Sequence, residues 1–120
     1  TAADYLRAIW NKDTLEFKED FVMLCLNGAH QVLGWVKVSS GGFTSTSVDP
    51  RVVFSLALQV GASALIFAHN HPSGVLEPSR DDRHLTEKLV SGAQLLHINV
   101  LDHFILGKDA VFSFAEHGLI

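Results

Sequence analysis

Two short stretches of this sequence are apolar at every position, and they constrain the fold more than any other feature. They run from Phe21 to Leu26 and from Ala64 to Ala68. A strand with one solvated face alternates apolar and polar side chains, whereas a strand that is apolar at both parities is covered on both faces. The sequence therefore predicts a central sheet with other layers on each side.

Segments with helical spacing alternate with the predicted strands. We expect helices from Ala2 to Trp10, from Pro50 to the glycine at Gly61 with Asp49 as N-cap, and from Ser79 to about Leu95. Further elements are a hairpin turn at Asn27-Gly28, a loop at 39–47, and strands at 32–38, 98–101, 104–106 and 111–114. Helices alternating with strands, together with hairpins, predict an α/β domain with a mixed central β-sheet flanked by helices.

Length and charge bound the function classes. The 120 residues, 48% of them hydrophobic, suit one ordered domain spanning 1–120, and no repeat or long linker divides them. A formal net charge of −4 argues against a dedicated DNA-binding or anionic-membrane surface and leaves weak or local DNA contacts open. No apolar run reaches membrane-spanning length. Because the chain begins without Met, we expect it to be a fragment of a longer protein.

The single cysteine limits redox and metal chemistry. Cys25 cannot form an internal disulfide, and one cysteine cannot build a cysteine-based zinc site. The sequence therefore favours a cytoplasmic location, where thiols stay reduced.

The segment with the most chemical information directly follows the second apolar stretch. His69 and His71 are two residues apart, so on a strand their side chains point to the same face. With a rise of ~3.3 Å per residue their Cα atoms lie roughly 6.5 Å apart, and two imidazoles can converge on one ion. Asp82 falls in the first turn of the next predicted helix, on the side that faces the strand end. These three side chains are our candidate metal ligands.

Two histidines and one carboxylate leave a fourth position open for water, which is the pattern of catalytic rather than structural zinc sites. The set suits Zn²⁺, and Fe²⁺, Co²⁺ and Mn²⁺ remain open. A simpler interpretation is that Ser79-x-x-Asp82 only caps its helix and that the histidines are exposed. The coincidence of a buried strand, His-x-His and a helix start favours the metal site.

This combination resembles the JAMM (MPN+) metalloprotease signature, and the run from His69 to Gly74 with Pro78-Ser79 resembles its bacterial RadC-like branch. The similarity also covers 21–27, 40–42, 100–103 and 114–119. The resemblance implies the JAMM/MPN fold, a cytidine-deaminase-like architecture, and a zinc-dependent peptidase or isopeptidase acting on a peptide or protein. It implies that His69, His71 and Asp82 bind zinc and that the Ser79 hydroxyl stabilises the developing oxyanion.

The resemblance further implies a general acid/base glutamate from an upstream strand. Glu19 is our candidate, because it lies two residues before Phe21 and shares its side of the strand. Glu16 and Asp20 are alternatives, and so is a solvated acidic turn without a catalytic role.

Other functions stay open at this point. The family's association with DNA repair suggests a metal-dependent nuclease, and a third possibility is a non-catalytic interaction module. Related proteins often carry an upstream helix-hairpin-helix segment, which these residues do not contain, so we expect direct DNA binding by this chain to be weak or absent.

The remaining histidines are interpreted as surface or locally hydrogen-bonded residues; they are His30, His84, His97 and His117. Asp102-His103 is interpreted as a polar pair at a strand end, with an indirect role at the site as the alternative.

Overall fold

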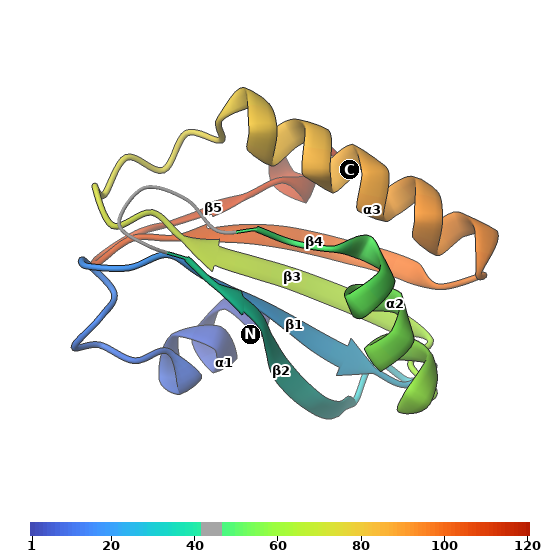
Figure 1. The fold of residues 1–120 in the computed structure, drawn as a ribbon. Coiled ribbons are helices and arrows are strands. Elements are labelled where there is room, and N and C mark those ends of the chain that lie inside the picture. The colour runs from blue at the N-terminus through green and yellow to red at the C-terminus, as the bar shows by residue number, and fades with distance from the viewer. Residues whose placement is uncertain (42–46) are drawn as a thin grey trace.

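The two apolar stretches lie side by side at the centre of one sheet, as their composition predicts (Figure 1). In the computed structural model, which describes residues 1–41 and 47–120, they form β1 (Asp20–Leu26) and β3 (Ala64–Asn70). The two strands pair antiparallel, and every residue of both is buried. These two strands form the interior of the molecule.

Three more strands complete the sheet within the described residues. β2 (Val32–Ser40) pairs antiparallel with β1, β4 (Asn99–Leu106) pairs parallel with β3, and β5 (Val111–Ser113) pairs antiparallel with β4. The order is β2-β1-β3-β4-β5. One parallel pair among antiparallel pairs makes the sheet mixed, which confirms the expected α/β fold class.

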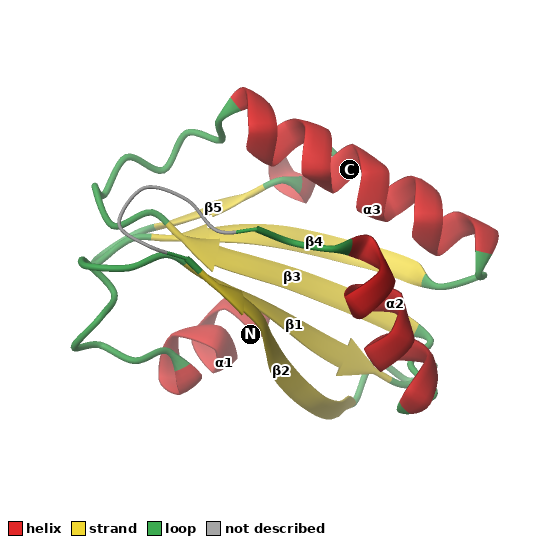
Figure 2. Ribbon diagram, in the orientation of Figure 1, coloured by secondary structure: helices red, strands yellow, loops and turns green. Residues whose placement is uncertain are grey.

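The helices cover both faces of this sheet. α2 (Pro50–Gln59) and α3 (Arg80–Leu95) pack on one face, and α1 (Ala2–Ile9) packs on the other (Figure 2). The core under α2 and α3 includes Phe21, Met23, Val53, Leu65, Phe67 and Leu89. The core under α1 includes Leu6, Trp10, Val22, Leu24, Ile66 and Leu106. Alternate residues of β1 and β3 therefore feed two cores, and this is why both strands are apolar at both parities.

Helix ends follow their sequence signals. Asp49 caps α2 by accepting from the Arg51 N–H, and Gly61 follows the helix with a φ of 68°. After α3, the Ile98 N–H donates to the Ala93 carbonyl, and His97 rather than a glycine occupies the left-handed position with a φ of 56°. In the described residues no helix combines the length and the apolar character needed to cross a membrane.

The structure differs from the sequence-based expectations in β2 and the hairpin. β2 continues to Ser40, into the expected loop, and residues 42–46 of that loop lie outside the described residues. The hairpin forms, but with a longer turn than Asn27-Gly28: Asn27 binds the Ala29 and Gln31 N–H groups, and His30 takes the left-handed conformation.

The expected strands at 98–101 and 104–106 are one strand, β4. The polar pair Asp102-His103 was expected to lie at a strand end, but it lies inside β4. The strand continues because the polar groups have partners: Asp102 accepts hydrogen bonds from the Ser113 hydroxyl and the Ala115 N–H.

Candidate metal centre

The two histidines of the site lie at the carboxyl end of β3. His69 is the penultimate residue of the strand and is 2% exposed, and the partly buried His71 follows directly after the strand. Their Nε2 atoms are 3.0 Å apart. The His69 ring stacks on Phe21 of the neighbouring strand, with 6.1 Å between ring centroids. Both imidazoles therefore present Nε2 to one point, as the spacing predicts.

Asp82 reaches the same point from the first turn of α3. Its Oδ2 lies 3.0 Å from His71 Nε2, and its Oδ1 lies 3.4 Å from His69 Nε2. The carboxylate also caps the helix, because the Ser79 N–H donates to Oδ2 at 2.9 Å and the Asp82 N–H donates to the Ser79 hydroxyl oxygen at 3.0 Å. The capping interpretation and the ligand interpretation are thus both compatible with one geometry.

Glu19 lies immediately before β1 and completes a group of four. Its Oε1 is 3.9 Å from His69 Nε2, and the residue is 8% exposed. One ligand atom from each of Glu19, His69, His71 and Asp82 lies within 4.8 Å of the others. Histidine nitrogens and carboxylate oxygens suit Zn²⁺ and related divalent transition metals, so the donor set fits such an ion without fixing its identity.

The two other acids considered from the sequence lie elsewhere. Glu16 is exposed on the preceding loop. Asp20 is buried, but it accepts a hydrogen bond from the Ser40 hydroxyl and pairs with Lys37 at 3.4 Å. Of the three acids, the structure brings Glu19 to the histidines.

The two carboxylates of the site have opposite electrostatic environments. Burial raises the pKa of Glu19, and the nearby His69 and His71 offset this only in part. Burial acts in the same direction on Asp82, but its close contacts with His69 and His71 outweigh it and hold the pKa of Asp82 far below its ordinary value. Burial alone would lower the pKa of His71, yet its contacts with Asp82 and the Val75 carbonyl raise it. Glu19 is therefore the more easily protonated acid.

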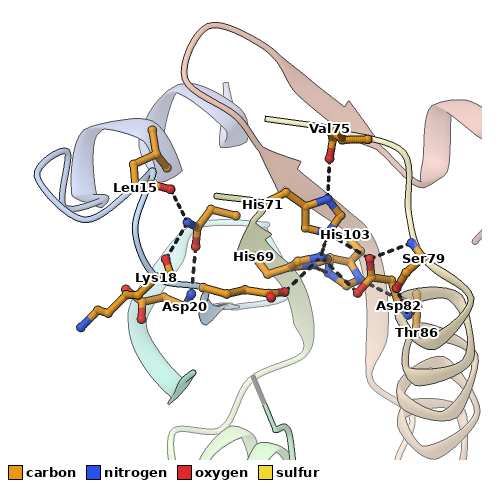
Figure 3. Close-up of polar contacts among 12 residues, drawn as sticks. Leu15, Lys18, Asp20, His69, His71, Val75, Ser79, Asp82, Thr86 and His103 are labelled. Carbon is orange, nitrogen blue, oxygen red and sulfur yellow. Dashed lines mark hydrogen bonds and ion pairs between the residues drawn. The ribbon is translucent and has the colours of Figure 1, made fainter. Parts of the chain in front are cut away.

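Asn70, between the two histidines, holds the loop that carries Glu19, a role that the sequence did not reveal. Its Nδ2 donates to the Leu15 carbonyl at 2.7 Å and to the Lys18 carbonyl at 2.9 Å, and its Oδ1 accepts from the Asp20 N–H at 2.8 Å (Figure 3). The backbone on both sides of Glu19 is thus bound to one side chain. The available signal was an asparagine that ends a run of buried residues, because buried amides are hydrogen-bonded.

His103 is a second residue whose role differs from the expectation. It lies fully buried inside β4, with Nε2 2.7 Å from His69 Nδ1 and Nδ1 2.7 Å from the Thr86 hydroxyl (Figure 3). Its ring stacks on Phe114 at 4.5 Å. Burial lowers the pKa of His103 well below its ordinary value. The alternative interpretation, an indirect role at the site, matches this geometry.

The other histidines are not part of the four-residue cluster. They are exposed, and they comprise His30, His84, His97 and His117. His117 Nδ1 lies 2.8 Å from the Ser113 carbonyl, and its ring stacks on Phe112. A surface or locally hydrogen-bonded role agrees with these positions.

Sequence comparisons agree with the resemblance inferred from the motif. The family model described as RadC-like JAB domain matches residues 1–119. The chain is 48% identical over 102 residues to a UPF0758 protein of Leptothrix cholodnii, covering 85% of this chain and 46% of that protein. It is 46% identical over 103 residues to the UPF0758 protein YfjY of Escherichia coli K12, covering 86% of this chain and 64% of that protein. The chain spans about half the length of several such curated relatives.

Proposed function

Because the chain belongs to the RadC-like JAB domain family, we propose that it is a zinc-dependent hydrolase of the peptidase or isopeptidase type. The observation that supports this most is the convergence of Glu19, His69, His71 and Asp82, with ligand atoms within 4.8 Å of one another. The proposed substrate is a peptide or protein, and the proposed setting is the reducing cytoplasm, in keeping with a single buried cysteine.

We propose that different residues of the site bind the metal and transfer the proton. His69, His71 and Asp82 would hold the ion, which supplies Lewis acidity and, in such sites, brings the pKa of a water to about 7. Glu19 would accept a proton from the attacking water and return it to the leaving amine. Its raised pKa suits this exchange, because an efficient general base titrates near the working pH.

Ser79 would stabilise the developing oxyanion. Its hydroxyl oxygen accepts from the Asp82 N–H, and among the described residues no acceptor takes the hydroxyl proton. That proton is therefore available to donate to substrate. By analogy with other oxyanion donors, losing it would cost about 10²–10³ in rate.

Elemental analysis of the purified protein tests the metal site. We expect about one divalent ion per chain in the wild type and loss of that ion in His69→Ala. Equal metal content in the two proteins, or none in the wild type after incubation with Zn²⁺, would contradict the proposal.

A cleavage screen with and without a chelator tests the chemistry. We expect chelator-sensitive cleavage of peptide or isopeptide substrates and no cleavage of DNA. Chelator-sensitive DNA cleavage that is lost in Asp82→Ala would replace the proposal with a metal-dependent nuclease. A metal-loaded protein that cleaves neither class, with Glu19→Gln equal to the wild type, would favour a non-catalytic interaction module.

A further inference from the structure

A series of hydrogen bonds leads from α3 through β4 to His69. The bond at the α3 end determines which atom donates in each of the others. The Thr86 hydroxyl donates to the Asp82 carbonyl at 2.8 Å, because a carbonyl oxygen can only accept. A hydroxyl has one proton, so toward His103 Nδ1, 2.7 Å away, the Thr86 oxygen must accept. His103 Nδ1 therefore carries a proton.

The next link follows from the surroundings of His103. The ring is fully buried among Phe21, Phe67 and Phe114. In the described part of the chain its polar side-chain contacts are Thr86 and His69, and neither is a carboxylate. Such a ring is neutral, and with Nδ1 protonated its Nε2 is an acceptor. His69 Nδ1, 2.7 Å from that nitrogen, must then donate.

We propose that Thr86 and His103 are positioning residues that fix His69 in the tautomer whose Nε2 lone pair faces the metal site. This inference deepens the proposed function, and it rests on metal binding rather than on hydrolysis. This series of hydrogen bonds also connects two of the proposed metal ligands, because it starts at the backbone carbonyl of Asp82 and ends on the ring of His69.

His71 takes the same tautomer through a single hydrogen bond to a nearby backbone carbonyl. His71 Nδ1 lies 2.6 Å from the Val75 carbonyl, which only accepts, so His71 also keeps Nε2 for a ligand bond. His69 is nearly inaccessible to solvent, and its Nδ1 faces another imidazole instead of a carbonyl. The tautomer of His69 is therefore set by residues far away in the sequence.

Nitrogen-15 NMR of the metal-free wild type tests the proposal directly. In long-range proton–nitrogen spectra at mildly alkaline pH, we expect His69 and His103 both to show a protonated Nδ1 and an unprotonated Nε2. A protonated Nε2 on His69 would overturn the assignment. This measurement needs no variant, so a folding defect cannot obscure it.

A pair of variants at Thr86 tests the consequence for metal binding. Thr86→Val removes the hydroxyl and keeps the shape, whereas Thr86→Ser keeps the hydroxyl and serves as the matched control. By competition with a chelator for Zn²⁺, we expect Thr86→Val to bind about 10- to 100-fold more weakly and Thr86→Ser to bind as the wild type does. Wild-type affinity in Thr86→Val, or equal weakening in both variants, would overturn the proposal.

The tautomer assignment and the proposed function fail separately. A wild type that binds no Zn²⁺ contradicts the proposed function, while the NMR spectra of the metal-free protein still decide the tautomer. A protein that binds Zn²⁺ tightly with His69 in the opposite tautomer contradicts this inference alone.

Discussion

Asp82 and Glu19 are two acids of one site, and the protein holds them in opposite ways. The Asp82 carboxylate accepts from the Ser79 N–H and lies within 3.4 Å of both histidines. The Glu19 carboxylate accepts no hydrogen bond from a described residue, and its ion-pair partner, His69 Nε2, is 3.9 Å away. For Glu19 the structure fixes the backbone instead, through Asn70.

The difference matches the two tasks proposed for these acids, metal binding for Asp82 and proton transfer for Glu19. A metal ligand works best in one fixed orientation and in its charged form, and hydrogen bonds provide both. A group that takes and returns a proton must accept it readily and be free of competing donors. Environments that push the pKa values of two neighbouring acids apart are typical of such paired roles.

Removing the charge of Asp82 should have the largest effect. Asp82→Asn keeps an oxygen that can cap α3 but loses the anionic ligand. Changes beside a metal ligand cost up to about 100-fold in affinity, and we expect loss of the ligand itself to exceed that. Competition with a chelator for Zn²⁺ measures the affinity of the variant. Asp81 is the exposed neighbour of Asp82, so Asp81→Asn is the matched control. Equal affinity in the two variants would remove Asp82 from the ligand set.

Neutralising Glu19 should separate chemistry from binding. We expect Glu19→Gln to lower the rate of substrate cleavage by about 10²–10⁴-fold while metal content stays near the wild-type value. The exposed Glu16 lies on the same loop, so Glu16→Gln should leave the rate unchanged. The assignment of the base is wrong if Glu16→Gln causes the larger loss.

Removing the hydrogen bonds between Asn70 and the loop should displace Glu19 without changing its carboxylate. Asn70→Ala removes three hydrogen bonds at a fully buried position, and we expect it to cost about 2–4 kcal/mol in unfolding free energy. A misplaced catalytic group also costs about 10-fold or more in rate. Both can be measured by urea unfolding and by cleavage assays at a temperature where the variant is folded.

Asn27→Ala is the control for this loop, because Asn27 also binds loop backbone but lies in the β1–β2 hairpin. It should lower stability by about 1 kcal/mol and leave the rate unchanged. Similar rates for folded Asn70→Ala and Asn27→Ala would show that Asn70 does not position Glu19.

The smallest effect is expected in the pH dependence of the metal-free protein. The lowered pKa of Asp82 stabilises the fold above the ordinary value of 3.8, and this stability is lost as the pH falls below it. The raised pKa of Glu19 has the opposite sign, so its charge destabilises the fold as the pH rises above 4.5. At neutral pH in chelator, urea unfolding should therefore find Glu19→Gln more stable than the wild type and Asp82→Asn less stable. Changes of the same sign in both variants would contradict the opposed environments.

The sequence could predict that the three proposed ligands lie close together, because they come from neighbouring segments of the chain. His69 and His71 share one strand end, and Asp82 lies in the first turn of the helix that follows. The central sheet was predictable for a similar reason, since the apolar pattern of two strands fixes burial on both faces.

For the general base, the sequence offered Glu19 but left Glu16 and Asp20 as alternatives, because the position of this acid depends on a contact between distant parts of the chain. Phe21 pairs with His69 across the sheet, and this register sets Glu19 opposite the site. For the same reason, an indirect role of His103 at the site could be named only as the alternative to a polar pair at a strand end. Its partners, His69 and Thr86, come from two other elements, and a polar pair inside a strand resembles a strand end when those partners are unknown.

The start of α3 has a consequence for how rigid the site is before any ion arrives. Asp82 Oδ2 closes the first turn of the helix and also faces His71, so the torsion angles of the carboxylate are settled when the helix forms. Little conformational entropy remains to be lost on metal capture. Amide hydrogen exchange at Ser79 and Asp82 would then be slow already in the metal-free protein, and the ion would meet a preformed rather than an induced coordination sphere.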